Sequence, residues 1–373
     1  MTYNLKKEDL KINKVARKIK ILRSLDPINL AKEKRRFFNL ENYNPYFRYK
    51  KPKIDISELF RILDDISFDS SPLGILLEKK KKELVCLLSL WDNIGNNKKF
   101  TFYSKKAFGT PPQEIINKAK EELKFKKDKP IKKEGYLKES KIIKILEQSL
   151  KQYGLQEKKW KVSIAKGIVP NFSVDRFKKV LFVKRGIEVS RRDLRSITAH
   201  EIETHILRSE NGGKQPYRIF RGGFPYYVEC EEGLATFNGR RFLSKNDKKY
   251  YWQPLLLIAV SLALKKSFRE VFEKLLEYGC SSEKAWNLSA RVKRGLSDTS
   301  SPGGFTKDYL YFSGYLKVRN IIDRRNIIKK LYFGKTNIPD LDKIDTIDNL
   351  NHNILLPFFI ENTIHDRKIY WRF

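Results

Sequence analysis

The alternation of hydrophobic and polar positions along this 373-residue chain predicts a protein built mainly of helices. Apolar residues recur at helical spacing in residues 54–63, 138–153, 250–265 and 268–278. A short apolar run at 180–183 is typical of a strand. Because helical patterns outnumber extended ones and no internal repeat is present, we expect an α+β fold that is predominantly helical.

A further helix is predicted over residues 191–207. Its start is marked by Ser190, whose hydroxyl can accept the free backbone N–H of Asp193. We expect the helix to end near Asn211-Gly212-Gly213, because Asn and Gly tolerate the left-handed conformation that is common at a helix C-terminus. Another apolar segment follows the loop, at 226–242.

The first 53 residues combine a basic amphipathic pattern with a linker. They hold 16 Lys plus Arg against five Asp plus Glu, and Pro45 and Pro52 mark residues 42–53 as the linker. The basic helix either packs on its own domain or lies on nucleic acid or a membrane surface, and its pattern fits both. We predict a basic extension and linker at 1–53, a main domain at 54–365 and a tail at 366–373. The apolar positions of the helix are Leu10, Ile12, Val15, Ile19 and Leu22.

Composition adds a strong positive charge to this picture. The chain has 78 Lys plus Arg against 44 Asp plus Glu, a formal net charge of +34. Hydrophobic residues make up 40%, which is enough for a core and excludes an intrinsically disordered protein. The charge either attracts polyanions such as nucleic acid or acidic protein tails, or reflects a lysine-rich bias spread over the surface.

Other features of the chain indicate a cytoplasmic protein. Its three cysteines form no CxxC pair, which favours a reducing compartment over a disulfide scaffold. The N-terminus has no apolar stretch of the kind found in secretory signals. The most apolar stretch, 255–264, is about half as long as the ~20 residues that a membrane span requires. We therefore expect no membrane span.

Two of the four histidines carry the candidate chemistry. His200 and His205 stand in an HExxxH string with Glu201 beside the first of them, while His352 and His365 are expected to be ordinary histidines. Histidine is a common zinc ligand, and an adjacent acid can activate a metal-bound water. On a regular helix the i, i+5 spacing separates two side chains by about 140°. A shared ion therefore requires a π-bulge between them, a feature found mostly at functional sites.

A third ligand can come from the apolar segment at 226–242. Catalytic zinc commonly uses two histidines and one glutamate, and leaves one position open. A helix–loop–helix of this length can return Glu231 or Glu232 to the first helix, and the residues alone leave the choice open. The neighbouring Cys230 is more typical of a buried apolar cysteine than of a ligand.

Several strings resemble the motifs of one family, in order and with compatible spacing. Residues 200–208 resemble its HEIGTH element, and residues 231–235 resemble its QEGLA motif. The family comprises the microtubule-associated tyrosine carboxypeptidases and the bacterial flavohemoglobin expression-modulating QEGLA motif proteins. Shorter likenesses lie at 215–217, 222–225, 291–295, 306–311, 334–335 and 356–357.

The resemblance implies a zincin-like metallopeptidase domain that binds one Zn²⁺ per chain. His200, His205 and Glu232 would be the metal ligands. Glu201 would accept the proton of the zinc-bound water and pass it to the leaving amine. Glu231 stands where the motif has Gln, which makes the choice of Glu232 as ligand less secure. Glu203 stands where HEIGTH has Gly, and it either points away from the metal or supports a ligand.

The resemblance also implies a carboxypeptidase that releases a C-terminal residue, tyrosine by family likeness, from a peptide or protein. Such an enzyme needs a donor for the oxyanion and a cation for the terminal carboxylate of the substrate. The net charge would favour acidic substrate chains. The candidate substrate-binding residues are Tyr217, Arg218, Arg291, Arg294, Lys307 and Tyr311.

Two alternatives differ in class from a peptidase. A polyanion-binding or nucleic-acid-binding protein with a structural zinc site would bind nucleic acid in a salt-dependent way that requires residues 1–53. A regulatory protein with an inactive peptidase fold is disfavoured, because the chain retains His200, His205, Glu201 and Glu232.

Overall fold

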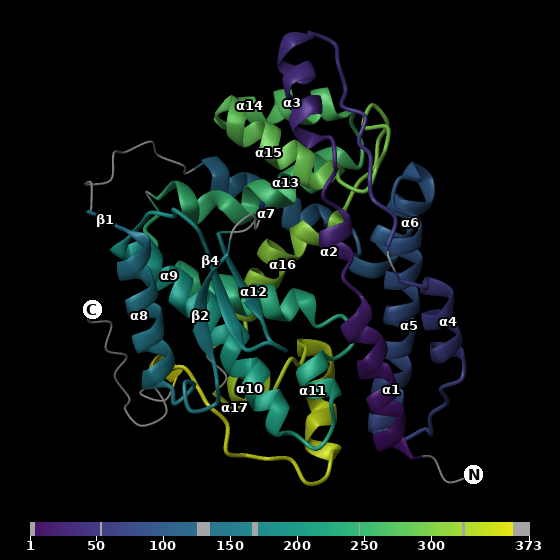
Figure 1. The fold of residues 1–373 in the computed structure, drawn as a ribbon, viewed down its shortest axis with the longest axis vertical. Helices are drawn as coiled ribbons and strands as arrows, with labels where there is room; N and C mark the ends of the chain where they lie inside the picture. Colours follow the sequence, from purple (N-terminus) through teal and green to yellow (C-terminus); the bar gives the residue numbers. More distant parts are fainter. Residues whose placement is uncertain are drawn as a thin grey trace. The chain divides into compact units, whose positions relative to one another are not determined.

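The computed structural model describes residues 4–52, 54–124, 135–165, 171–245, 247–322 and 325–360 (Figure 1). Most of these residues are helical and few are in strands, so the predicted α+β, predominantly helical class is confirmed. The chain forms two compact units. Unit 1 contains Met1–Lys126 and Tyr251–Ser313, and unit 2 contains Lys127–Tyr250 and Gly314–Phe373. Within the described ranges, no helix is both long and apolar enough to cross a membrane.

Unit 1 is helical. Its apolar helix α13, at Trp252–Ala263, is buried as the sequence predicts, with Leu255 and Leu257 fully inaccessible. The other helices are α1 (Leu5–Lys18), α2 (Ile21–Ser24), α3 (Leu30–Asn39), α4 (Ile56–Asp64), α5 (Pro72–Asp92), α6 (Asn97–Phe108), α7 (Gln113–Lys124), α14 (Phe268–Glu277), α15 (Ser282–Lys293) and the 3₁₀ turn Thr306–Tyr309. Helix α16 (Leu310–Arg319) begins in unit 1 and continues into unit 2.

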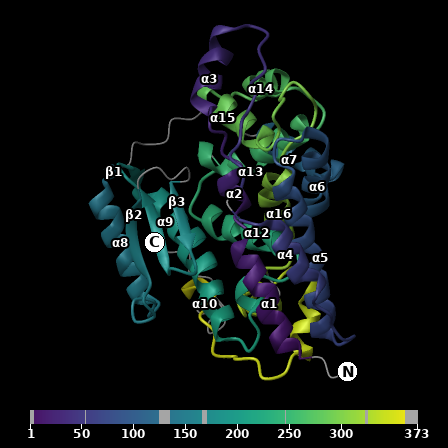
Figure 2. The same ribbon diagram turned by 45° about the vertical axis from the view of Figure 1, so that its right-hand side comes forward.

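The basic N-terminal helix α1 packs within unit 1. It lies beside α4 and α5 (Figure 2), and Ile12 and Val15 on its apolar face are buried in their shared core. Its apolar face is therefore covered by its own unit, while Leu10 remains half exposed. The predicted domain boundaries at 53/54 and 365/366 stay predictions; Lys53 and both residues of the second boundary lie outside the described part of the chain.

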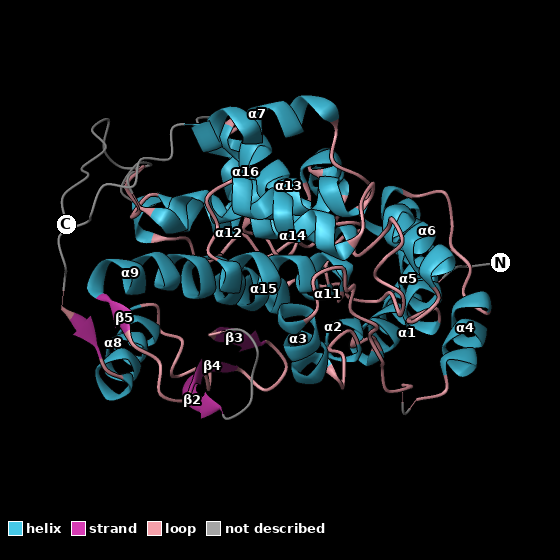
Figure 3. Ribbon diagram, turned by 90° about the horizontal axis from the view of Figure 1, so that it is seen from above, coloured by secondary structure: helices cyan, strands magenta, loops and turns pink. Residues whose placement is uncertain are grey.

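All the described strands belong to unit 2 (Figure 3). The central strand β4 (Val180–Lys184) is the predicted strand, and it pairs in parallel with β2 (Lys161–Ala165) and antiparallel with β3 (Phe172–Asp175). The short strands β1 (Tyr136–Leu137) and β5 (Val189–Ser190) form a separate antiparallel pair. Strand β5 leads directly into the first helix of the candidate site.

Three helical segments follow β5 without a break: α9 (Arg191–His200), a π-helical turn (Glu201–Ile206) and α10 (Leu207–Lys214). We call this continuous element the metal helix. Its predicted start is confirmed, because the Ser190 hydroxyl accepts the backbone N–H of Asp193 at 3.1 Å.

The metal helix ends at Lys214, next to the predicted end near Asn211-Gly212-Gly213, but the predicted left-handed C-cap is wrong: Gly212 and Gly213 have no positive φ and the capping residue Gln215 is extended. Contacts with distant segments, and not a left-handed helix end, account for the glycine at 212 and the asparagine at 211. A side chain on Gly212 would stand 2.4 Å from the carbonyl oxygen of Phe220, so glycine permits a close approach and not a turn. The Asn211 amide donates to the carbonyl of Leu355 at 2.7 Å, and its oxygen accepts the Leu355 N–H at 2.8 Å.

The remaining elements of unit 2 surround the metal helix and the sheet. Helix α8 (Glu139–Gln152) contacts β2, and the π-helical turn contacts β3. The other elements are α11 (Ile219–Gly222), α12 (Val228–Arg240), α17 (Arg325–Leu331) and the 3₁₀ turns Ile338–Asp340 and Asp342–Thr346, with a further 3₁₀ turn, Lys248–Tyr251, at the junction with unit 1.

Candidate metal centre

The π-helical turn brings the two histidines of the HExxxH string together. The N–H of Leu207 bonds to the carbonyl of Ile202, five residues earlier, as the π-type spacing requires. The rings of His200 and His205 consequently lie 5.0 Å apart between centroids, at 78° to each other. The π-bulge predicted from the i, i+5 spacing is confirmed.

Side-chain hydrogen bonds support this turn from within. The Thr204 hydroxyl donates to the carbonyl of Ala199 at 3.0 Å, also five residues earlier. The amide of Asn238 on α12 donates to the Thr204 hydroxyl at 2.8 Å and to the Tyr332 hydroxyl at 3.0 Å. These groups are buried, so their hydrogen bonds are needed to offset the cost of removing them from water.

Helix α12 supplies a carboxylate opposite the two rings. The Oε2 atom of Glu232 lies 4.0 Å from Nε2 of His200 and 3.9 Å from Nε2 of His205. Small residues allow this approach, since a side chain on Gly239 would stand only 3.1 Å from the Ser196 carbonyl of α9. The two helices therefore pack closely, with Glu232 facing the histidines.

Ligand atoms of these three side chains lie within 4.8 Å of one another. Because zinc binds imidazole nitrogen and carboxylate oxygen at about 2.0–2.2 Å, separations near 4 Å are within reach of one ion. Burial lowers the pKa of His200 and favours its neutral form, which is the form that ligates a metal. These three side chains could hold a metal ion, and they are the three that the family resemblance implies as ligands.

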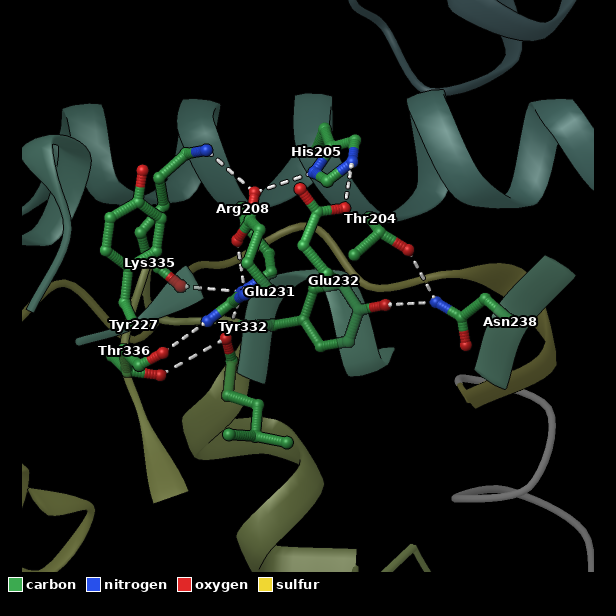
Figure 4. A network of polar contacts seen from close by, with 12 residues as sticks. Thr204, His205, Arg208, Tyr227, Glu231, Glu232, Asn238, Tyr332, Lys335 and Thr336 are labelled. Carbon is green, nitrogen blue, oxygen red and sulfur yellow. Dashed lines mark hydrogen bonds and ion pairs between the residues drawn. The ribbon is translucent and has the colours of Figure 1, made fainter. Parts of the chain in front are cut away.

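Glu231 lies on the other side of the His205 ring (Figure 4). Its Oε1 atom is 2.7 Å from Nδ1 of His205 and accepts a hydrogen bond from Nζ of Lys335, also at 2.7 Å. Its Oε2 atom accepts a hydrogen bond from Nη1 of Arg208. The two neighbouring glutamates thus face different ring nitrogens, and only Glu232 belongs to the possible metal triad.

The cations around Glu231 are themselves held in place. Arg208 is fully buried and donates to the carbonyls of Leu331, Gly334 and Thr336 at 2.7–2.9 Å. Burial raises the pKa of Glu231, but Lys335 and Arg208 outweigh burial and hold that pKa well below its ordinary value. Burial also lowers the pKa of His205, but Glu231 outweighs it and leaves the pKa raised.

Glu201 and Glu203 take different directions from the π-helical turn. Glu203 accepts a hydrogen bond from the Tyr153 hydroxyl at 2.9 Å, and burial raises its pKa. It is therefore engaged with the C-terminal end of α8. Glu201, the first residue of the turn, is half-buried, and its charge favours the protonated form of both histidines. At His200 this effect only partly offsets burial, which leaves the pKa of His200 lowered.

The candidate substrate-binding residues are divided between the units. Tyr217 and Arg218 lie in unit 2, between α10 and α11, where Tyr217 is half-buried and Arg218 is exposed. Arg291, Arg294, Lys307 and Tyr311 lie in unit 1. The roles predicted for these six residues stay predictions.

Two of the unit 1 candidates are part of a buried ion cluster. Arg291 bonds Asp308 through Nε at 2.6 Å and Nη2 at 3.0 Å, and Nη2 of Arg294 lies 3.7 Å from the same carboxylate. Nζ of Lys307 donates to the Tyr311 hydroxyl at 3.4 Å. The two arginines therefore have a counterion within their own unit.

Sequence reasoning missed Arg208 and Lys335 as partners of Glu231. Both stand in strings that resemble the family motifs, at 200–208 and 334–335, and this likeness is the one signal in the sequence that marked them as candidates, without indicating that they contact Glu231. Cys230 is buried with a free thiol, as predicted, and burial raises its pKa to about 11. His352 is exposed and lies beside the Phe333 ring, whereas His365 is outside the described residues.

Comparison with known proteins gives a family match over most of the chain. Residues 35–368 match the family model described as microtubule-associated tyrosine carboxypeptidase. Microtubule-associated tyrosine carboxypeptidase 1 of Mus musculus is 31% identical over 177 residues, which are 45% of this chain and 36% of that protein. The Homo sapiens protein of the same name is 31% identical over 183 residues, 47% of this chain and 37% of that protein.

A longer alignment is found with a second mouse protein. This tyrosine carboxypeptidase candidate, MATCAP2, is 26% identical over 367 residues, 95% of this chain and 60% of that protein. The matched regions thus span between 36% and 60% of the length of these three relatives.

Proposed function

Because the chain belongs to the microtubule-associated tyrosine carboxypeptidase family, we propose that it is a zinc-dependent carboxypeptidase with a zincin-like metal site. The observation that carries the proposal is the approach of His200, His205 and Glu232 around one point, with Glu201 on the same helical turn. The names of the relatives support the carboxypeptidase class, and the donor set supports zinc as the metal.

His200 and His205 would hold the ion through Nε2, and Glu232 would hold it through its carboxylate. When bound, zinc would act as a Lewis acid that polarises the scissile carbonyl and makes water more acidic. The other ring nitrogen of His205 is engaged by Glu231, which leaves Nε2 as the nitrogen facing Glu232.

Glu201 would move the proton. Its carboxylate would accept a proton from the attacking water and deliver it to the nitrogen of the leaving residue as the C–N bond breaks. The water would give one proton to the leaving amine through Glu201, and its oxygen with the second proton would stay on the carbonyl carbon. The products are therefore a new terminal carboxyl group and a neutral amine, and transfer of the carboxyl proton then gives carboxylate and ammonium.

We propose a C-terminal residue of a peptide or protein as the substrate, with tyrosine suggested by the family name. The net charge of +34 would draw in acidic chains. Tyr217, Arg218, Lys307 and Tyr311 remain candidates for holding the oxyanion or the terminal carboxylate. Arg291 and Arg294 are weaker candidates, because Asp308 already engages them.

The test combines metal analysis with digestion of a peptide library that varies in its C-terminal residue. We expect about one zinc per chain in the wild type and in Glu201→Gln, because Glu201 is not a ligand. Cleavage should fall at least ~100-fold in Glu201→Gln, since general base catalysis contributes about 10²–10⁴-fold. Glu203→Gln is the matched control on the same turn, since an amide oxygen can still accept from Tyr153, and it should retain cleavage. Full cleavage by Glu201→Gln would contradict the mechanism.

The alternative of a polyanion-binding protein stays a prediction. Its test is salt-dependent binding to nucleic acid, compared between the full chain and a chain that lacks residues 1–53.

A further inference from the structure

The ion cluster behind His205 consists of Glu231, Arg208 and Lys335, and none of these residues takes part in the proton transfer proposed above. We infer that Glu231 is a positioning residue for the metal centre: it orients the His205 ring, and Arg208 and Lys335 hold Glu231 in place to do so. This inference rests on the metal ligands of the proposed function.

The two ring nitrogens of His205 face different carboxylates at different distances. Nδ1 of His205 lies 2.7 Å from Glu231, whereas Nε2 lies 3.9 Å from Glu232. The first distance is a hydrogen bond, and the second leaves room for an ion between the two groups. A hydrogen on Nδ1 that is donated to Glu231 places the lone pair on Nε2, where a metal would need it.

The cluster is built so that Glu231 cannot turn away. Its side chain is 4% exposed, and each carboxylate oxygen has a cationic donor: Lys335 on Oε1 and Arg208 on Oε2. Lys335 is fixed through its backbone as well, since its N–H bonds the Phe220 carbonyl and its own carbonyl accepts the Phe224 N–H. Arg208 is fixed by the three carbonyls of the 331–336 segment.

The negative charge of Glu231 also balances the two buried cations, Arg208 and Lys335. A glutamine in this position could accept the hydrogen bond from His205, but it would leave Arg208 and Lys335 buried without a nearby anion. A buried charge that loses its partner is costly. The glutamate at this position, where the related motif has Gln, therefore supplies both buried cations with an anion in this chain.

The experiment must separate the hydrogen-bond acceptor from the charge. Glu231→Gln combined with Lys335→Met removes one negative and one positive charge and keeps an acceptor for His205. Glu231→Leu combined with Lys335→Met removes the same charges and leaves no acceptor. The readout is the dissociation constant for Zn²⁺, measured by competition with a chromogenic chelator, and urea unfolding of the zinc-free proteins is recorded in parallel.

We expect the Leu/Met variant to bind zinc about 10–100-fold more weakly than the wild type, which is the usual effect of removing a partner of a ligating histidine. The Gln/Met variant should stay within about threefold of the wild type, because its amide oxygen still accepts the hydrogen of Nδ1. A role confined to folding would lower the unfolding free energy without separating the two zinc affinities. Equal zinc binding by the two double variants overturns the inference.

Another double variant allows the inference to be tested even if the Leu/Met protein does not fold. If the Leu/Met protein does not fold, Glu231→Asn with Lys335→Met is used, because the shorter amide moves the acceptor away by one methylene group. It should show the same loss of zinc affinity, and retention of wild-type affinity overturns the inference. A wild-type protein that binds no zinc would instead contradict the proposed function itself.

Discussion

Each unit of this protein contains a buried carboxylate that is held by two cations. In unit 2 Glu231 lies between Arg208 and Lys335, and in unit 1 Asp308 lies between Arg291 and Arg294. The Asp308 side chain is fully inaccessible and that of Glu231 is 4% exposed. What differs is the third partner, because only Glu231 also bonds a histidine of the metal triad.

This difference shows how one ionic arrangement can serve two purposes. A buried carboxylate between two cations is a rigid unit that ties segments together, as Asp308 ties α15 to the 3₁₀ turn Thr306–Tyr309. When one carboxylate oxygen also bonds an imidazole, as Glu231 bonds His205, the same rigidity would fix a candidate metal ligand. Buried ion clusters should therefore be judged by what else they contact, and not by their charges alone.

The largest expected contrast concerns the metal itself. His205→Ala should not bind zinc at concentrations that saturate the wild type. The loss of zinc affinity should exceed the ~100-fold that is typical when only a hydrogen-bond partner of a ligand is removed. Asp308→Asn should bind zinc like the wild type, because its cluster contains no residue of the triad. Metal content after gel filtration, measured by mass spectrometry, checks both variants. Stoichiometric zinc in His205→Ala would remove this histidine from the ligand set.

The next contrast concerns folding stability. Glu231→Ala leaves two buried cations without their carboxylate, which costs about 3–5 kcal/mol. Asp308→Ala should cost less, because the side chain of Arg291 is 34% exposed and water screens its charge. Urea denaturation of the zinc-free proteins should show a loss in both, with the larger loss in Glu231→Ala. Only Glu231→Ala should also weaken zinc binding in the folded protein. An equal loss of zinc affinity in Asp308→Ala would mean that the two clusters do not differ as described.

The smallest contrast is a dependence on pH. Burial raises the pKa of Asp308, but Arg291 and Arg294 outweigh burial and lower the pKa to about 2. A carboxyl whose pKa is lower in the folded state stabilises the protein above its unfolded pKa, near 3.9, and this contribution disappears as the pH falls from about 4 to about 2. The contribution is about 2–3 kcal/mol.

Urea titrations of the zinc-free protein between pH 5 and pH 2.5 measure this dependence. Asp308→Asn should be less stable than the wild type at pH 5 and should approach it as the pH falls, because the variant has no carboxyl to protonate. A constant difference across this range would show that Asp308 contributes through packing and not through its charge.

Local features of the site followed from the sequence because neighbouring residues determine them. The cap at Ser190 depends on a residue three positions later, and strand β4 is marked by its own apolar run. The π-helical turn was predictable because the spacing of His200 and His205 fits a shared metal only if one extra residue is accommodated.

Features that depend on distant segments could not be predicted in this way. The error at Gly212 arose because glycine also serves close packing, and the Phe220 carbonyl that requires it lies in the next helix. The pattern of α1 fitted two surroundings equally, and only its burial beside α4 and α5 decides between them. The partners of Glu231 were likewise hidden, since Lys335 is far from Glu231 along the chain.

The contacts of the metal helix also set an order of events during synthesis. The ribosome makes the chain from its N-terminus, so residues 191–214 emerge well before the segments that hold them. Arg208 obtains its carbonyl partners only when 331–336 has been made, and Asn211 obtains its partners only with Tyr332 and Leu355. In a nascent chain His200 and His205 are therefore made well before the segments that support their helix, and the framework of the candidate metal centre cannot form until residues 331–355 have been translated.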